Sequence, residues 1–180
     1  PGTTSRVLDA LKRECVRATF FLLGRNAQAQ PALARRALAE GHSIGHHTFA
    51  HPLINHMALA KAEAEIDRGI VADEVALYGQ RRSSPATPFF RFPFFEMTPA
   101  TLDALQKRGI AVFGADLWAS DWTPMTPAQQ LKLLTERLQI ARKGIILLHD
   151  PKAQTAAMLP AFLRALTARG YRVVHVVPAP

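Results

Sequence analysis

The chain has one cysteine, Cys15, among its 180 residues. A single thiol excludes an internal disulfide and a cluster of thiolate metal ligands. Because Cys15 precedes an apolar run, we expect it to be a small residue of the core. No apolar run approaches the ~20 residues of a membrane-spanning helix, and no signal peptide remains. The chain begins at Pro1 rather than Met, so we expect a processed or excised piece of a longer product.

Acidic residues are also scarce. The 22 lysines and arginines outnumber 14 aspartates and glutamates, which gives a formal charge of +8. Such an excess suggests a polyanion-binding protein. However, Lys12, Lys107, Arg142 and Arg169 all lie near predicted C-terminal ends of helices, where cations complement the helix dipole. We therefore expect no specific nucleic-acid binding, although attraction to an acidic cell-surface polymer stays open.

Short apolar runs alternate with helical patterns along the whole chain, without a linker between them. The runs are apolar on both faces, which is typical of a parallel sheet covered by helices. No glycine-rich phosphate loop follows any run, so the nucleotide-binding form of this fold loses support. We expect one α/β domain over residues 1–180, either doubly wound or a closed barrel. The predicted strands are residues 18–23, 43–47, 88–93, 110–115, 144–148 and 171–177; the predicted helices start near residues 3, 31, 58, 98, 126 and 155.

Four of the seven histidines fall within residues 41–52. His47 and His51 are four residues apart, a spacing that on a helical turn puts both rings on one face, about 5–6 Å apart at Cβ. Imidazole is the commonest side-chain ligand of transition metals. The sequence therefore predicts a metal-binding pair, and the competing interpretation is two hydrogen-bonding histidines beside a turn.

Other polar residues also follow predicted strands: Arg91, Asp116 with Asp121, and His149. In a parallel β/α barrel, side chains at this edge of the sheet converge on a substrate. Each residue alone could simply satisfy hydrogen bonds of its own loop. As a set they predict an active site at the C-terminal ends of the strands.

Together these segments resemble the polysaccharide deacetylases of carbohydrate esterase family 4, the proteins with a NodB-homology domain. Residues 45–52, GHHTFAHP, are similar to the family's H-[ST]-x-x-H-P motif, and residues 91–94, RFPF, to its R-x-P-[YF] motif. Residues 116–122, DLWASDW, resemble its acidic motif that ends in tryptophan. Residues 145–150, IILLHD, resemble its closing L-L-H-D. The motifs are in the family's order and span nearly all of the chain.

The resemblance implies a distorted parallel (β/α) barrel of about seven strands, with the first strand missing from this chain. It implies an enzyme that uses a divalent metal to remove acetyl groups, most often N-acetyl groups, from a polysaccharide or oligosaccharide. Zinc is expected, and cobalt, nickel or iron would also suit two histidines and a carboxylate. An extracytoplasmic location is favoured, with a cytoplasmic one left open.

The resemblance also implies roles for individual residues. His47 and His51 would bind the metal, and His149 would be the general acid that protonates the leaving amine. Arg91 would orient the catalytic base through a charged hydrogen bond. Asp121 belongs to the acidic motif, and we expect it to take part in catalysis.

Aromatic residues complete the expected site. The backbone N–H of Phe94 would stabilise the developing oxyanion. Trp122 and Phe95 would present flat faces to a sugar ring. Phe95 replaces a glycine that is usual in the family, which narrows the expected cleft. Phe89, Phe90 and Phe92 are expected in the core.

Two further departures limit this expectation. The family's T-F-D-D-G-P motif, which supplies the catalytic base and a third metal ligand, is absent from the chain. In the acidic motif Trp118 takes the place of the first aspartate, and Asp116 is the candidate to replace it as partner of His149. We therefore expect this chain to be impaired. The alternatives are a deacetylase-like domain that binds glycan without hydrolysis, and a basic polyanion-binding module in which the histidines are incidental.

Overall fold

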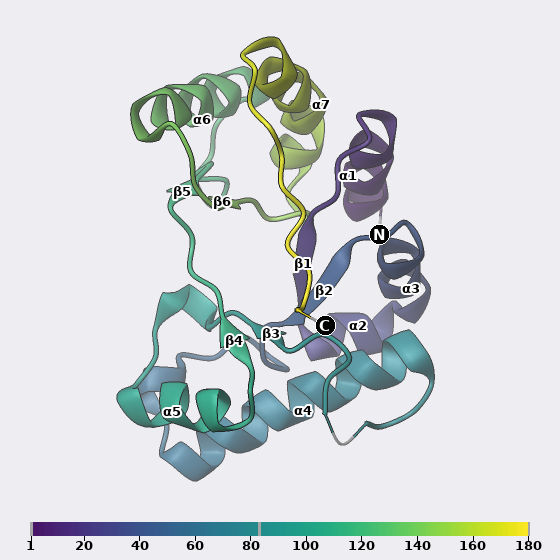
Figure 1. Cartoon of the computed structure of the whole chain (residues 1–180), viewed down its shortest axis with the longest axis vertical. Helices are drawn as coiled ribbons and strands as arrows, with labels where there is room; N and C mark the ends of the chain where they lie inside the picture. The colour runs from purple at the N-terminus through teal and green to yellow at the C-terminus, as the bar shows by residue number, and fades with distance from the viewer. Residues whose placement is uncertain (1, 83, 180) are drawn as a thin grey trace. The chain divides into compact units, whose positions relative to one another are not determined.

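The computed structural model describes residues 2–82 and 84–179. Contacts divide these residues into two compact units, which we describe one at a time. The larger unit contains residues 18–113 and 176–179, and the smaller unit contains residues 2–17 and 114–175. Figure 1 labels the helices and strands of both units.

The larger unit is built on a parallel sheet with the strand order β1-β2-β3-β4. The last residue of β1, Leu22, pairs with His46, and His46 pairs in turn with Phe90. Because these three strands end at the same level, the loops that follow them begin side by side at one edge of the sheet. The strands are β1 (Thr19–Leu22), β2 (Ser43–His46), β3 (Phe89–Phe90) and β4 (Ala111–Val112).

Helices pack against this sheet, and the longest of them is α4 (Leu59–Tyr78), which also packs against three other helices (Figure 1). Gly79 ends α4 with a left-handed conformation (φ 75°), which glycine adopts without strain. The partners of α4 are α2 (Gly24–Ala29), α3 (Pro31–Ala39) and α5 (Pro99–Lys107). Two short 3-10 segments, η1 (Ile54–His56) and η2 (Pro93–Phe95), complete the unit.

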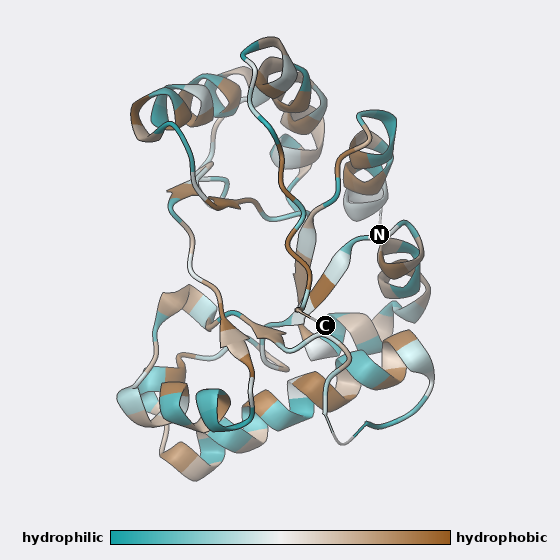
Figure 2. Ribbon diagram, viewed as in Figure 1, coloured by the Kyte–Doolittle hydropathy of each residue, from teal (hydrophilic) through white to brown (hydrophobic). Residues whose placement is uncertain are grey.

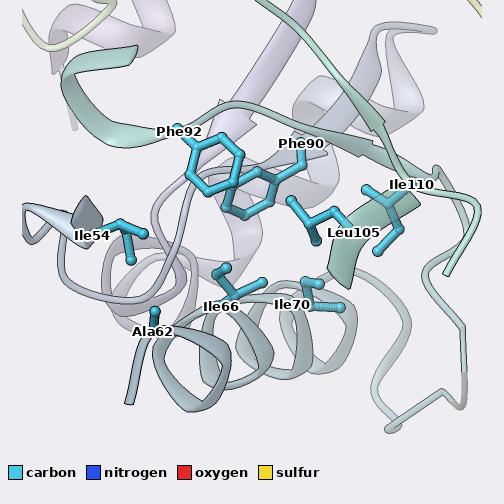
Figure 3. Close-up of a cluster of buried hydrophobic side chains, with 8 residues drawn as sticks. All are labelled: Ile54, Ala62, Ile66, Ile70, Phe90, Phe92, Leu105 and Ile110. Atoms are coloured by element: carbon cyan, nitrogen blue, oxygen red, sulfur yellow. The ribbon is translucent and has the colours of Figure 1, made fainter. Parts of the chain in front are cut away.

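The core of the larger unit lies between α4 and the sheet (Figure 3). Ala62, Ile66 and Ile70 are spaced four apart, so they form one apolar stripe on α4. They lie beneath the rings of Phe90 and Phe92, whose centroids are 4.9 Å apart. Burying each large side chain stabilises the fold by about 1.5–3 kcal/mol. The prediction that Phe89, Phe90 and Phe92 are core residues is confirmed.

The smaller unit contains a two-stranded parallel sheet and three helices. The strands β5 (Leu117–Trp118) and β6 (Ile146–Leu147) pair through Leu117 and Ile146. A capping box of Thr126 and Gln129 starts the second helix of the unit, because each side chain accepts a backbone N–H of the other residue. The helices are α1 (Gly2–Arg13), α6 (Pro127–Ala141) and α7 (Ala153–Ala168), and α7 packs against both others.

The predicted α/β class with parallel strands is confirmed, and the described residues form six strands in two parallel sheets. The predicted strand over residues 171–177 is wrong, since residues 171–179 form none. Much of this segment is hydrophobic in Figure 2, yet Val174 is 77% exposed. The carbonyl of Val176 accepts the hydroxyl of Ser43 instead of a strand N–H. High β-propensity alone does not create a strand without a neighbouring ladder.

Cys15 is exposed, so its predicted place in the core is wrong. It follows the end of α1 with a left-handed backbone (φ 53°), in the turn that redirects the chain. A turn at the surface points its side chains to solvent. None of the helices in the described ranges is long and apolar enough to cross a membrane.

Candidate active site

His47 and His51 lie in the loop that follows β2, and their rings meet edge to face with centroids 4.8 Å apart. The chain forms no helical turn here, because Thr48 (φ 65°) and His51 (φ 64°) both have left-handed backbones. The two reversals of the chain bring the rings together instead. Left-handed conformations of non-glycine residues cost on the order of 1–3 kcal/mol each and cluster at functional sites.

Hydrogen bonds to its backbone stabilise the strained conformation of this loop. The Thr48 carbonyl accepts the N–H of Gly24 at 3.0 Å, and the Phe49 carbonyl accepts the N–H of Arg25 at 3.1 Å. The Thr48 hydroxyl accepts the N–H of His51 at 3.0 Å. The first residues of α2 therefore fix the loop through two backbone hydrogen bonds.

Helix α4 also contacts the loop, because its backbone packs against Thr48 at Gly69. A Cβ at this position would lie 2.4 Å from the carbonyl carbon of Thr48. Only glycine allows the helix backbone to approach the loop backbone so closely. Sequence reasoning missed Gly69, although a glycine inside a long helical pattern is a signal of close packing.

The next strand end supplies a contact that orients His47. Its Nδ1 lies 2.6 Å from the carbonyl oxygen of Arg91. If Nδ1 donates its proton to this carbonyl, the neutral ring presents Nε2 as the ligand atom. This is the tautomer that a metal-binding histidine needs.

The Arg91 side chain is buried within the larger unit. Its Nε donates to the carbonyl of Phe113 at 3.4 Å, and its guanidinium lies 4.2 Å from the centre of the Phe21 ring. Burial lowers the pKa of Arg91 to about 10, so the group remains a cation at neutral pH. A fixed cation of this kind can hold a carboxylate or a developing negative charge.

Two exposed aromatic residues follow Arg91. Phe94 is 58% exposed and Phe95 is 38% exposed. Both have left-handed backbones, with φ of 56° and 60°. The Phe94 ring lies 4.5 Å from the ring of His51. The apolar face of Phe94 thus lies against His51.

In the smaller unit, Asp121 and His149 form a close pair. Asp121 Oδ1 lies 2.7 Å from Nδ1 of His149, and Oδ2 accepts the His149 backbone N–H at 2.7 Å. Although Asp121 is only 2% exposed and its burial raises the pKa, the hydrogen bonds from His149 and Thr155 outweigh burial and lower it. Asp121 is therefore an anion beside the imidazole.

Asp116 has a different environment. Its Oδ2 accepts the backbone N–H of Ile145 at 2.6 Å, and the carboxylate packs against Gly144. The structure therefore shows Asp121, not Asp116, in contact with His149. Trp122 is 52% exposed, and its ring lies 6.1 Å from that of His149. Asp150, whose pKa is raised by burial, accepts the hydroxyl of Thr4.

The predicted site residues thus form two groups. The larger unit holds His47, His51, Arg91, Phe94 and Phe95, and the smaller unit holds Asp116, Asp121, Trp122 and His149. Across residues 2–82 and 84–179, no three histidine, cysteine or acidic side chains gather closely enough to hold a metal ion.

Comparison with known proteins gives a consistent result. The sequence profile described as polysaccharide deacetylase matches residues 1–113. The chain is 30% identical over 177 residues to the peptidoglycan-N-acetylglucosamine deacetylase PgdA of Listeria monocytogenes. This match covers 97% of this chain and 35% of PgdA. It therefore spans about a third of that relative's length.

A chitooligosaccharide deacetylase of Azorhizobium caulinodans is 31% identical, over 95% of this chain and 85% of that protein. Among solved structures, the peptidoglycan deacetylase PdaC of Bacillus subtilis superposes with a TM-score of 0.83 at 27% identity, over 98% of this chain and 82% of that one. The chain belongs to the polysaccharide deacetylase family. Deacetylases of this family are generally metal-dependent.

Proposed function

We propose that this chain belongs to an enzyme that hydrolyses acetyl groups on a polysaccharide or oligosaccharide with the aid of a divalent metal. N-acetyl groups of glucosamine-containing glycans are the proposed target, because the relatives are named for peptidoglycan and chitooligosaccharide. The observation that carries the proposal is the close pair of His47 and His51, in which the carbonyl of Arg91 orients the His47 ring.

The histidine pair fits a metal in part. Two rings 4.8 Å apart can direct one nitrogen each to a common point, and His47 has a hydrogen bond suited to a ligand. Catalytic zinc sites usually have three protein ligands. When bound by His47 and His51, zinc or a similar ion would supply Lewis acidity toward the acetyl carbonyl and lower the pKa of water.

The remaining chemistry falls to the protein's own groups. Arg91, a buried cation, orients a carboxylate that acts as the base, or a developing anion. The backbone N–H of Phe94 donates to the oxyanion. His149 donates a proton from Nε2 to the leaving amine, while Asp121 holds Nδ1 and stabilises the charged ring.

Exposed aromatic faces support a sugar as the substrate. Phe94 lies beside His51, Phe95 is exposed near the Arg91 guanidinium, and Trp122 lies beside His149. Flat apolar surfaces with a few polar groups are typical of sites for small ligands. Phe95 leaves less room than a glycine would, so we propose that it restricts which sugar rings can approach the pair.

The test is acetate release from an acetylated chitooligosaccharide by the complete gene product, with and without added zinc. We expect zinc-dependent release that is lost in the double variant His47→Ala/His51→Ala. The variant His56→Ala, which removes an exposed histidine of the same region, is the matched control. Full activity in the double variant would overturn the metal-dependent function.

A second function is favoured by one specific observation: the described residues bring only two metal-ligating side chains together at this site. With two ligands, the 180 residues alone should bind zinc weakly and act slowly, or bind glycan without hydrolysis. Titration of this chain with zinc and with chitooligosaccharide separates the cases. Glycan binding without acetate release from the complete gene product would favour the non-catalytic function.

A further inference from the structure

Two buried polar residues stand behind Asp121 in the smaller unit. Thr155 lies in the first turn of α7, and its hydroxyl is 2.8 Å from Asp121 Oδ2. Gln130 on α6 lies 3.0 Å from the Thr155 hydroxyl through its Nε2. Both residues are at most 1% exposed. Polar side chains are rarely buried to this degree unless they are hydrogen-bonded.

The direction of each hydrogen bond in this chain of groups is determined by chemistry. An ionised carboxylate only accepts, so the Thr155 hydroxyl donates its single proton to Asp121. The hydroxyl oxygen can then only accept from Gln130, which places the amide nitrogen of Gln130 toward Thr155. Donation therefore runs from Gln130 to Thr155 to Asp121.

His149 also donates to this carboxylate, through its ring Nδ1 to Oδ1 and through its backbone N–H to Oδ2. Asp121 Oδ2 thus has two donors, and its Oδ1 faces the imidazole. Gln154, the residue before Thr155, also donates to the backbone carbonyl of Asp121 at 3.0 Å. The first turn of α7 therefore holds Asp121 by side chain and main chain, where the helix dipole also favours an anion.

We propose that Thr155 and Gln130 are positioning residues that fix the Asp121 carboxylate and thereby keep the His149 proton on Nδ1. This inference rests on the proposed function only for its catalytic consequence. In that function, Nε2 must exchange protons with the substrate while Nδ1 stays bound to Asp121. A carboxylate free to rotate would release Nδ1 and allow the other tautomer.

The first experiment is nuclear magnetic resonance of the 180-residue chain labelled with ¹⁵N-histidine. It measures which nitrogen of neutral His149 carries the proton and how fast the Nδ1 proton exchanges with water. In Thr155→Val, which keeps the shape but removes the donor, we expect exchange to be about tenfold faster and the Nε2–H tautomer to increase, because a hydrogen bond to a charged group is lost. Thr155→Ser restores the donor and should restore both values.

Gln130 provides a test of direction. Gln130→Glu keeps the shape, but its carboxyl group can accept the Thr155 proton and so compete with Asp121. It should speed exchange as Thr155→Val does. Gln130→Met removes the amide but leaves the Thr155 hydroxyl able to donate, so its effect should be smaller. The control Thr167→Val makes the same change in α7 at a hydroxyl that donates to Leu163.

Asp121 and Asp150, the carboxylates whose charges interact with His149, are retained in every variant. The proposal would be overturned if folded Thr155→Val had the same Nδ1 proton exchange rate and the same His149 tautomer as the parent. Equal exchange rates in Gln130→Glu and Gln130→Met would also overturn it. Should Thr155→Val not fold, Thr155→Cys, a much weaker donor of similar size, makes the same comparison.

The catalytic consequence is tested separately. In the active gene product, Thr155→Val should lower kcat about tenfold with little change in KM, and Thr155→Ser should recover it. The resonance readout does not need activity. If the gene product proves inactive, the proposed function fails while the positioning of His149 is still decided.

Discussion

The two groups of site residues are held in different ways. In the larger unit, the backbone holds the histidine pair in place. The loop contains left-handed residues, its carbonyls accept N–H groups from the start of α2, and Gly69 of α4 packs against Thr48. In the smaller unit, side chains hold His149 through Asp121, Thr155 and Gln130. The first arrangement should be sensitive to added bulk, and the second to the loss of a donor or a charge.

The largest effect is expected from Asp121→Asn, which tests the side-chain arrangement. The amide keeps the shape but cannot stabilise a charged His149 ring. We expect kcat of the gene product to fall by about 10²–10⁴-fold, the range of a general acid–base contribution. Asp116→Asn is the matched comparison, because its oxygen can still accept the Ile145 N–H. Equal losses in both variants would contradict the assignment of Asp121.

Asp121 also predicts a dependence of stability on pH. Its folded pKa lies below the ordinary value of 3.8, so its contribution is present above that value and is lost as the pH falls through the folded pKa. Urea unfolding of the 180-residue chain at acid and neutral pH measures this. The parent should lose more stability than Asp121→Asn between the two conditions.

The next effect in size is expected from Gly69→Ala, which tests the backbone arrangement. A methyl group 2.4 Å from the Thr48 carbonyl carbon must push helix and loop apart. We expect the free energy of unfolding to fall by about 3 kcal/mol, at the upper end of overpacking costs. Zinc binding by the histidine pair should weaken in the same variant.

Urea unfolding and zinc titration measure the two consequences of this change. Gly2→Ala is the control, since a Cβ there meets no atom within 4 Å. Gly69→Ala with parental stability and parental zinc affinity would show that the loop is not held by its contact with α4.

The same contrast explains which features could be predicted from the sequence. The alternation of strands and helices was readable from Phe20, Ile44 and Phe90, because buried parallel strands have no polar face. His149 and Asp121 were readable because a motif names residue types. Their hydrogen-bond partners were not, since Thr155 and Gln130 are far apart in sequence and have ordinary helical surroundings.

Backbone features were the harder part. The spacing of His47 and His51 correctly indicated proximity, but the loop conformation that produces it could not be predicted, because left-handed backbones at Thr48 and His51 have no strong signal in those residue types. The short helix α2 was also unexpected: Gly24 looked like the end of a strand, and its role of gripping Thr48 depends on tertiary contact.

A smaller effect is expected from Phe95→Gly, which changes an exposed residue of the histidine group. Phe95 has a left-handed backbone that glycine adopts without strain, but glycine also gains freedom in the unfolded chain. The two effects oppose each other, so stability should change by less than about 1 kcal/mol. In contrast, KM for chitooligosaccharides should rise, because a flat contact face is lost. Kinetics with oligomers of several lengths measure this, and an unchanged KM at every length would remove Phe95 from the substrate site.

An effect on stability that is also small is expected from Asp73→Asn, in the buried core of the larger unit. Burial, together with the neighbouring charge of Glu74, raises the pKa of Asp73 well above 3.8. The cost of ionising Asp73 is therefore absent at low pH and appears as the pH rises from the unfolded pKa toward the folded one. An asparagine can keep the contact with His46, which lies 2.8 Å from Asp73 Oδ2, without that cost.

We therefore expect Asp73→Asn to be more stable than the parent at pH 7, by about 1 kcal/mol, with a smaller advantage at pH 4. Urea unfolding at the two pH values measures the difference. Its sign is opposite to that of Asp121→Asn, because hydrogen bonds favour the charged form of Asp121, whereas burial disfavours the charged form of Asp73. A loss of stability at pH 7 in Asp73→Asn would show that Asp73 stabilises the fold as an anion, and that the larger unit also depends on a charged side chain.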